Sequence, residues 1–285
     1  NNSHYWVSEH PNIIEGNESW GIIDDEKRPI VHADCEVKLT RDQVSLSEIK
    51  ESLKGQADLE ISVQDALNTR LHEFGEKFWK LVADQHDETK ANLLNSQLSI
   101  KKIEYSDRYL YNPLSLGLVH SAINGLRNLV GTDRWNEVPI IIQTANKSDN
   151  LKPGNLIFHD WMDSKDRDVV FEHLFQKSNL NLDLNVQDRR NLEHARAFKI
   201  TFENDSILTV RLDQGVGYWR VENPRYSNRR STRENTSFEF KSVNNGEAGL
   251  EQEASQILDK NPALVGNSYP TQIFVKWRKP ESITN

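Results

Sequence analysis

The chain has 285 residues, of which 36% are hydrophobic and 27% are charged, so it can bury at least one sizeable core. It contains no apolar run near the roughly 18 residues of a membrane span, and its first residues lack the basic and apolar regions of a signal peptide. We therefore expect a cytoplasmic protein without a transmembrane segment. Cys35 is the only cysteine, which excludes an internal disulfide and a zinc site built from several cysteines.

The formal net charge of −8 excludes a protein that binds nucleic acid or anionic lipid over its whole surface. The charge is uneven, because residues 189–241 hold eleven Lys and Arg against seven Asp and Glu, a local balance of +4. One region can therefore still meet an anion. Because the chain does not begin with Met, we interpret it as a fragment of a longer protein, whose other domains share its function.

The first 95 residues are expected to form an N-terminal region. Prolines and glycines interrupt residues 1–60, where short aromatic and β-branched stretches favour strands, most clearly at residues 32–39. From residue 64 to 82, apolar side chains recur at helical spacing, at Leu67, Leu71, Phe74, Phe78 and Leu81. This spacing predicts a long amphipathic helix that packs on the domain that follows.

Residues 96–285 are expected to form one α/β domain, which opens with alternating strands and helices. Strands are predicted at residues 98–105, 138–144 and 180–186. The first intervening helix begins with Asn112 as its cap and Pro113 at its first position, and the second spans residues 163–177. A β-α-β-α-β order predicts a mostly parallel sheet with helices on both faces.

The second half of this domain adds antiparallel strands to the sheet. Two alternating runs at residues 196–202 and 207–212 flank the turn dipeptide Asn204-Asp205, which predicts a hairpin. Further strands are predicted at residues 236–243 and 271–277, with a helix at 247–260 between them. The expected fold class is thus α/β with a mixed, mostly parallel sheet.

The first candidate site follows the first predicted strand, at Ser106-Asp107-Arg108-Tyr109-Leu110. Ligands of open α/β sheets bind at the carboxyl ends of the strands, and a helix N-terminus there adds N–H donors. Arg108 is therefore placed to bind an anion. The alternative is that Asp107 and Arg108 brace the turn while Tyr109 and Leu110 anchor it.

The second candidate site is His194-Ala195-Arg196, at the start of the predicted hairpin. Period-two alternation places His194 and Arg196 on one strand face. An imidazole beside a cation is what phosphodiester cleavage through a histidine nucleophile needs. Phospholipase D enzymes carry His-x-Lys followed four residues later by Asp, whereas this chain has Arg196 in place of Lys and Thr201 in place of Asp.

The segment that starts at His194 and continues to Gly215-Val216-Gly217-Tyr218-Trp219-Arg220 resembles the C-terminal domain of MIT-domain-containing proteins. The resemblance covers residues 98–277 and implies a phospholipase-D-like fold that needs no catalysis. Two further segments, Phe74-Gly75-Glu76-Lys77-Phe78-Trp79 and residues 105–115, are similar to C-terminal regions of helicase-type proteins of bacterial phage defence. That second resemblance implies an accessory part of a larger defence machine.

The third candidate site is a basic loop over residues 224–233, which contains Arg225, Arg229, Arg230 and Arg233. Arginines for phosphates and nearby aromatic side chains for stacked bases are typical of a nucleic-acid contact. Arg220, just before the loop, belongs to the same basic region. The alternative is a solvated loop whose charges only keep the fold soluble.

Several kinds of site are not encoded in the sequence. The nine histidines are scattered without zinc-ligand spacing, and no nucleotide-binding glycine motif or Gly-x-Ser-x-Gly nucleophile elbow occurs. We expect no metal and no cofactor.

Three functions remain open from the sequence. The first is a non-catalytic binding module for DNA or a partner subunit, which uses Arg108, His194, Arg196, Arg220 and the loop arginines. The second is a divergent phosphodiesterase or nuclease with His194 as nucleophile and Arg196 as phosphate clamp, and the third is a protein- or membrane-binding module. The expected partners are DNA, other domains or subunits of a defence complex, and a second copy of the chain as a homodimer.

Overall fold

The computed structural model describes residues 21–23, 29–32, 57–95, 98–135, 137–145, 161, 164–188, 192, 196–222, 247–267 and 269–280. The chain divides into two compact units, Asn1–Gln56 and Ala57–Asn285. In the first unit, β1 (Gly21–Ile23) and β2 (Pro29–His32) pair as an antiparallel hairpin. The second unit holds the remaining described helices and strands and carries the candidate sites.

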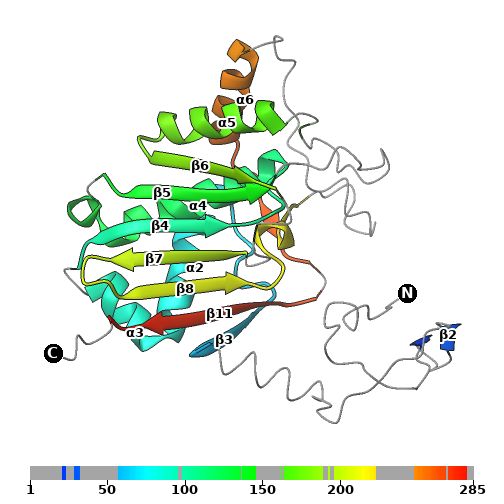
Figure 1. The fold of residues 1–285 in the computed structure, drawn as a ribbon, viewed down its shortest axis with the longest axis horizontal. Coiled ribbons are helices and arrows are strands. Elements are labelled where there is room, and N and C mark those ends of the chain that lie inside the picture. Colours follow the sequence, from blue (N-terminus) through cyan, green and yellow to red (C-terminus); the bar gives the residue numbers. More distant parts are fainter. Residues whose placement is uncertain are drawn as a thin grey trace. The chain divides into compact units, whose positions relative to one another are not determined.

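A seven-stranded sheet in the order β3-β11-β8-β7-β4-β5-β6 organises the second unit (Figure 1). Only the pairs β4-β5 and β5-β6 are parallel, and the other four pairs are antiparallel. A separate two-stranded ribbon pairs β9 (Arg220–Val221) with β10 (Leu264–Val265). The strands of the main sheet are β3 (Leu59–Val63), β4 (Ile100–Ser106), β5 (Pro139–Ala145), β6 (Asn181–Gln187), β7 (Ala197–Phe202), β8 (Ile207–Leu212) and β11 (Thr271–Arg278).

The described helices form a single layer on one face of this sheet, with α2 and α4 behind the strands in Figure 1. Helix α5 belongs to the same layer, because the ring of Phe175 contacts that of His120 on α4 with centroids 5.5 Å apart. The topology explains why α4 and α5 lie on the same face. The connections β4-α4-β5 and β5-α5-β6 step across the sheet in the same direction, and when both are right-handed, their helices cover the same face. The helices are α2 (Leu71–Gln85), α3 (Asp87–Lys90), α4 (Pro113–Val130), α5 (Ser164–Lys177) and α6 (Glu247–Asp259), with a π-helix at Ala91–Asn95 and 3-10 turns at Thr132–Arg134 and Val216–Tyr218.

The mixed α/β fold expected from the sequence is confirmed, and two details differ. Antiparallel pairs outnumber parallel ones, because the hairpin β7-β8 and β11 insert antiparallel beside β4, and β3 then adds to β11. The described helices cover one face of the sheet rather than both. The strand predicted at residues 236–243 lies outside the described residues. The amphipathic helix predicted at residues 64–82 forms as α2, but it begins only at Leu71 and ends at Gln85, and it packs on α4 within the same compact unit as the sheet.

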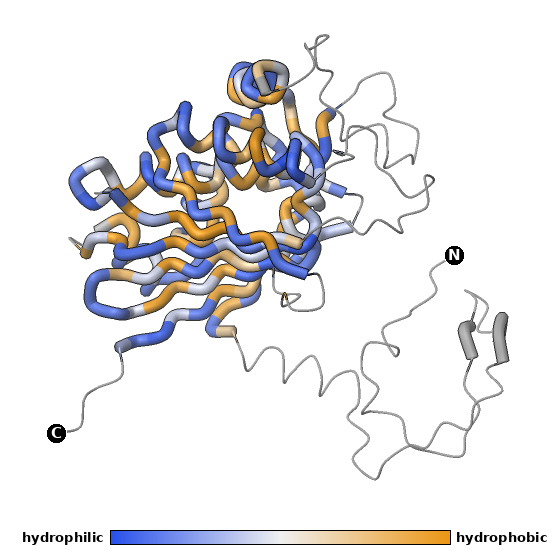
Figure 2. Tube along the Cα trace, turned by 45° about the horizontal axis from the view of Figure 1, so that its top comes forward, coloured by the Kyte–Doolittle hydropathy of each residue, from blue (hydrophilic) through white to orange (hydrophobic). Residues whose placement is uncertain are grey.

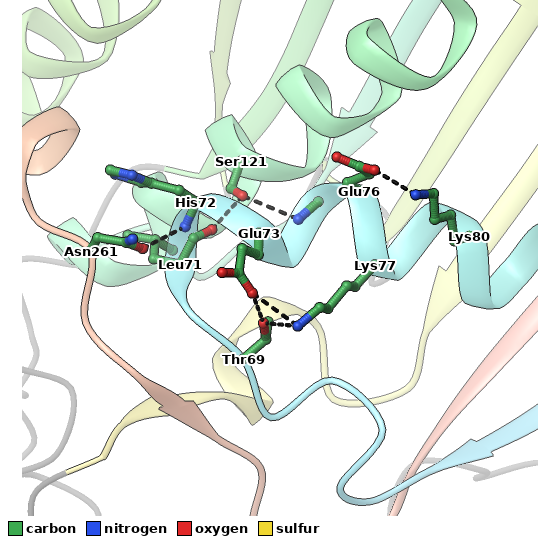
Figure 3. Close-up of polar contacts among 10 residues, drawn as sticks. Thr69, Leu71, His72, Glu73, Glu76, Lys77, Lys80, Ser121 and Asn261 are labelled. Carbon is green, nitrogen blue, oxygen red and sulfur yellow. Dashed lines mark hydrogen bonds and ion pairs between the residues drawn. The ribbon is translucent and has the colours of Figure 1, made fainter.

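Helices α2 and α4 cross at an unusually short distance, which glycines make possible. An ideal Cβ on Gly75 would lie 1.8 Å from the carbonyl oxygen of Ser121, and one on Gly125 would lie 2.2 Å from the backbone carbon of Gly75. The Ser121 hydroxyl donates to the Leu71 carbonyl at 2.6 Å and accepts from the Gly75 amide at 3.2 Å (Figure 3). The crossing thus joins two backbones almost directly.

Local signals in the sequence explain how α4 begins. The Asn112 side chain accepts a hydrogen bond from the Ser115 amide at 2.8 Å, and Pro113 occupies the first helical turn, as predicted. At the other end, Gly131 has a φ of 83°, a conformation that favours glycine. The start of α4 is therefore set directly behind the carboxyl end of β4, where the first candidate site lies.

Candidate functional site

The loop after β4 forms a tightly bonded cluster around Asp107. Asp107 is 3% exposed, and its carboxylate accepts hydrogen bonds from the Tyr105 hydroxyl at 3.0 Å and from the Tyr109 amide at 2.9 Å. Burial raises the pKa of Tyr105 well above its usual value, and the charge of Asp107 adds to the rise, so the tyrosine keeps its proton and remains a donor. We call Tyr105, Asp107, Tyr109, Arg196 and Gly215 the edge cluster.

Arg196 joins the edge cluster from the start of β7. Its guanidinium lies over the ring of Tyr109, 5.1 Å from the centroid, and donates to the Asp213 carbonyl at 2.7 Å. Its φ of 31° is in a region that few residues other than glycine adopt. Gly215, with a φ of 63°, leaves room for this side chain, since a Cβ there would lie 2.8 Å from Arg196 Cδ. Three segments singled out in the sequence therefore meet at one sheet edge.

Arg108 and Arg220 have hydrogen-bond partners different from those of Arg196. Arg108 donates from Nε at 2.7 Å, and from Nη2, to the carbonyl of buried Leu192, so it braces the loop as the alternative interpretation describes. Arg220 lies on the ribbon β9-β10 and donates to the Asn267 side chain, and burial lowers its pKa. His194, Arg225, Arg229, Arg230 and Arg233 lie outside the described residues, so their placement stays a prediction.

The face of the sheet opposite the helices carries a second candidate site, which the sequence analysis did not identify. Side chains alternate along the strands between a buried apolar set and a partly or fully exposed set, an alternation visible as changing colour in Figure 2. The exposed set is mostly polar. We call it the open face, and its central residues are Lys102, Glu104, Lys199, Thr209, Arg211, Phe274, Lys276 and Arg278.

The open face is positive although the chain as a whole is negative. Five cations point outward from four neighbouring strands, at Lys102, Lys199, Arg211, Lys276 and Arg278, against carboxylates at Glu60, Glu104 and Asp183. Glu104 is held between two of them, at 3.1 Å from Lys102 Nζ and 3.3 Å from Lys199 Nζ. The positive charge is therefore concentrated over β8 and β11.

A stacked pair lies in this positive region. Arg211 and Phe274 are directly opposite each other on β8 and β11, and the Arg211 guanidinium carbon lies 4.6 Å from the centroid of the Phe274 ring. Both side chains are partly exposed. Two residues along β8, at the next outward position, Thr209 is paired with Lys199 on β7 and with Lys276 on β11. The open face thus presents a planar cation with two lysines beside it.

A third feature is a pocket of about 230 Å³ between α2, α4 and α6. Burial, with Arg127 and His72 nearby, lowers the pKa of His120 to about 4, so this imidazole is neutral at pH 7. A His120 ring nitrogen lies 2.7 Å from the hydroxyl of Ser178. The pocket is lined by Leu71, His72, Gly117, His120, Ser121, Asn124, Arg127, Asn128, Ile257 and Leu258.

Within the described residues, no three histidine, cysteine, aspartate or glutamate side chains come together as a metal site would require. None of the described helices is long and apolar enough to cross a membrane.

Comparison with known families identifies the second unit. Residues 57–277 match the family described as the C-terminal domain of the DEAD/DEAH box helicase YjiV. The chain belongs to this family. The match begins just before β3 and ends one residue before the end of β11, so it includes all seven strands of the sheet, apart from that last residue, and the helical layer. The comparisons with curated proteins and with solved structures found no match.

The family assignment confirms the helicase association that the sequence motifs predicted. The match contains the whole edge cluster and every central residue of the open face except Arg278, which lies one residue beyond its end. Sequence motifs led to residues of the edge cluster, whereas no motif indicated the open face. Alternation predicts which residues of a strand share a face, but only the strand order shows that Lys199, Arg211 and Lys276 are neighbours.

Proposed function

We propose that this helicase C-terminal domain is a non-catalytic module that binds nucleic acid through its open face. The observation that carries the proposal is the cluster of outward cations on β4, β7, β8 and β11 of a chain whose net charge is −8. Lysine and arginine side chains supply most of the affinity for a phosphate backbone, because binding releases condensed counterions. A helicase is a protein in which an accessory domain of this kind has a direct use.

The cations of the helical layer differ from those of the open face. On α2, Lys77 is bonded to Glu73 at 2.9 Å and Lys80 to Glu76 at 2.5 Å, each one helical turn away (Figure 3). A local carboxylate neutralises each of these lysines. By contrast, the positive end of the open face, over β8 and β11, carries Arg211, Lys276 and Arg278. Charge complementarity with a polyanion therefore favours the open face.

The finer expectations from the sequence belong to the same proposal. A phospholipase-D-like origin of the fold, a role in a bacterial antiphage machine in the cytoplasm, and contacts with other domains or a second copy of the chain are all compatible with an accessory helicase domain. A contribution of Arg196 and the loop arginines to nucleic-acid binding stays a prediction from the sequence. The phosphodiesterase alternative depends on His194, and it stays a prediction from the sequence.

Replacing Lys276 and Arg278 together by Ala should weaken binding of fluorescein-labelled DNA. The expected loss is roughly tenfold or more at moderate salt, and the slope of log affinity against log salt should become shallower by about two, one for each phosphate contact removed. Fluorescence anisotropy over a sodium chloride series measures both quantities.

The matched control is Lys77→Ala with Lys80→Ala, which removes the same charge from the helical layer and should leave the affinity within about twofold of the native value. Equal effects of the two double variants would indicate unspecific attraction and contradict the proposal. So would native protein that shows no binding at low salt.

A further inference from the structure

We infer that the open face binds single-stranded nucleic acid, with an unpaired base stacked on the Arg211 guanidinium. This inference rests on the proposed function and specifies its ligand. Its basis is the pair formed by Arg211 and Phe274, in which an aromatic ring supports a planar cation at 4.6 Å on a partly exposed sheet surface. Unpaired bases stack on aromatic rings and on guanidinium planes.

The geometry around this pair suits an extended strand of nucleic acid. Neighbouring β-strands are about 4.8 Å apart, and successive side chains on one face are about 7 Å apart along a strand. Lys276 is the next outward residue after Phe274 on β11. Lys199 on β7 lies two strands away from Lys276, with Thr209 of β8 between them. The phosphates that flank a base stacked on Arg211 would fall within reach of these two flexible lysine side chains.

A duplex fits this surface less well. Proteins that recognise the base sequence of duplex DNA insert a helix or a two-stranded β-ribbon into its major groove. The described helices lie on the other side of the sheet, and the outward side chains near Arg211 rise from a continuous sheet. In a duplex the base faces are already stacked on each other, so Arg211 could reach only phosphates. Stacking on Arg211 should therefore make the affinity for single-stranded DNA higher than the affinity for duplex DNA.

The decisive comparison uses two strands of the same length and charge, oligo-dT and the corresponding abasic oligonucleotide. The native chain should bind oligo-dT roughly tenfold more tightly than the abasic strand, because the abasic strand has no base to stack on Arg211. Blunt duplex DNA of the same length should bind more weakly than oligo-dT.

Arg211→Lys keeps the positive charge and removes the planar group. We expect its affinity for oligo-dT to fall to nearly that of the abasic strand, while its affinity for the abasic strand and its salt dependence stay unchanged. Phe274→Leu should act in the same direction, because it removes the ring that supports the guanidinium. Arg278→Lys makes the same chemical change on the same face away from the stacked pair and should have no effect.

The outcomes separate this inference from the proposed function. Salt-dependent binding that is equal for oligo-dT and the abasic strand, or that Arg211→Lys leaves unchanged, would overturn single-strand stacking and leave a phosphate-binding module. Tighter binding of duplex than of oligo-dT would also overturn it. Absence of binding to all three ligands would remove the proposed function itself. Near-ultraviolet circular dichroism of each variant verifies that the sheet is intact.

Discussion

Gly75→Ala is expected to lower the free energy of unfolding by about 3 kcal/mol or more, or to prevent folding. The added methyl carbon would lie 1.8 Å from the Ser121 carbonyl oxygen and 2.9 Å from the Ala122 Cα. These neighbours are backbone atoms of α4 and cannot move aside by changing a rotamer. The two helices would have to separate, which would break the hydrogen bonds that join Ser121 to Leu71 and Gly75.

Separation of α2 from α4 would disturb more than the crossing itself. Trp79 of α2 is fully buried and donates from its indole nitrogen to the Ala122 carbonyl at 2.8 Å, and its ring contacts that of Phe198 on β7. A shift of α2 would therefore also loosen its packing on the sheet. Urea unfolding followed by circular dichroism measures the loss, with the midpoint and slope fitted separately.

Gly117→Ala in α4 is the matched control for this variant. A Cβ there would meet only side-chain methyl groups, the nearest of them on Leu71 at 3.2 Å and Ile257 at 3.5 Å, and alanine favours helix over glycine by about 1 kcal/mol. Gly117→Ala should leave the stability within about 1 kcal/mol of the native value. Similar effects of the two substitutions would show that helix propensity, and not the close crossing, determines the requirement for glycine at position 75.

The stability of the domain should fall between pH 6.5 and pH 4 because of His120. Its pKa is about 4 in the folded protein, below the ordinary value of 6.5, because burial disfavours the imidazolium and Arg127 is close. In this window the unfolded chain takes up a proton that the folded chain does not, so lower pH favours unfolding. The contribution of His120 is fully present above pH 6.5 and declines by about 3 kcal/mol as pH falls to 4.

The difference between native protein and His120→Gln isolates this contribution, since carboxylates titrate equally in both. The native stability should decline more steeply than that of the variant over this window, as measured by urea unfolding at a series of pH values. His72→Gln is a second variant in the same pocket: because His72 helps to lower the pKa of His120, this substitution should make the decline slightly less steep than in the native protein. Parallel curves for native protein and His120→Gln would contradict a buried neutral histidine.

Much of the fold could be predicted from local sequence, as α4 and β8 illustrate. Asn112 and Pro113 mark the start of α4, and strict alternation defines β8 at the bounds predicted. The prediction that most strands are parallel was wrong, because pairing partners are distant in sequence. Strand β11 pairs with β3, more than 200 residues earlier, and no local pattern contains that information.

The candidate sites divide in the same way. Sequence motifs led to Asp107, Arg196 and the segment of Gly215, and the structure brings these together at the carboxyl end of β4. The motifs could not show that Arg108 would bind the Leu192 carbonyl, nor that Arg211 would stack on Phe274. A side chain's partner depends on which strands become neighbours, and here Phe274 reaches Arg211 only because β11 inserts beside β8.

By itself the sequence determined the class of the fold, the periods of its main helices and strands, the start of α4, and a similarity to helicase C-terminal regions that the family match confirms. These properties depend on residues within about one helix or strand of each other, where propensity, capping and alternation act. Only the tertiary structure decided which face of the sheet stays open and that its cations converge there. Charge on a surface is a property of the strand order, and strand order is set by burial of the whole apolar face against α2 and α4.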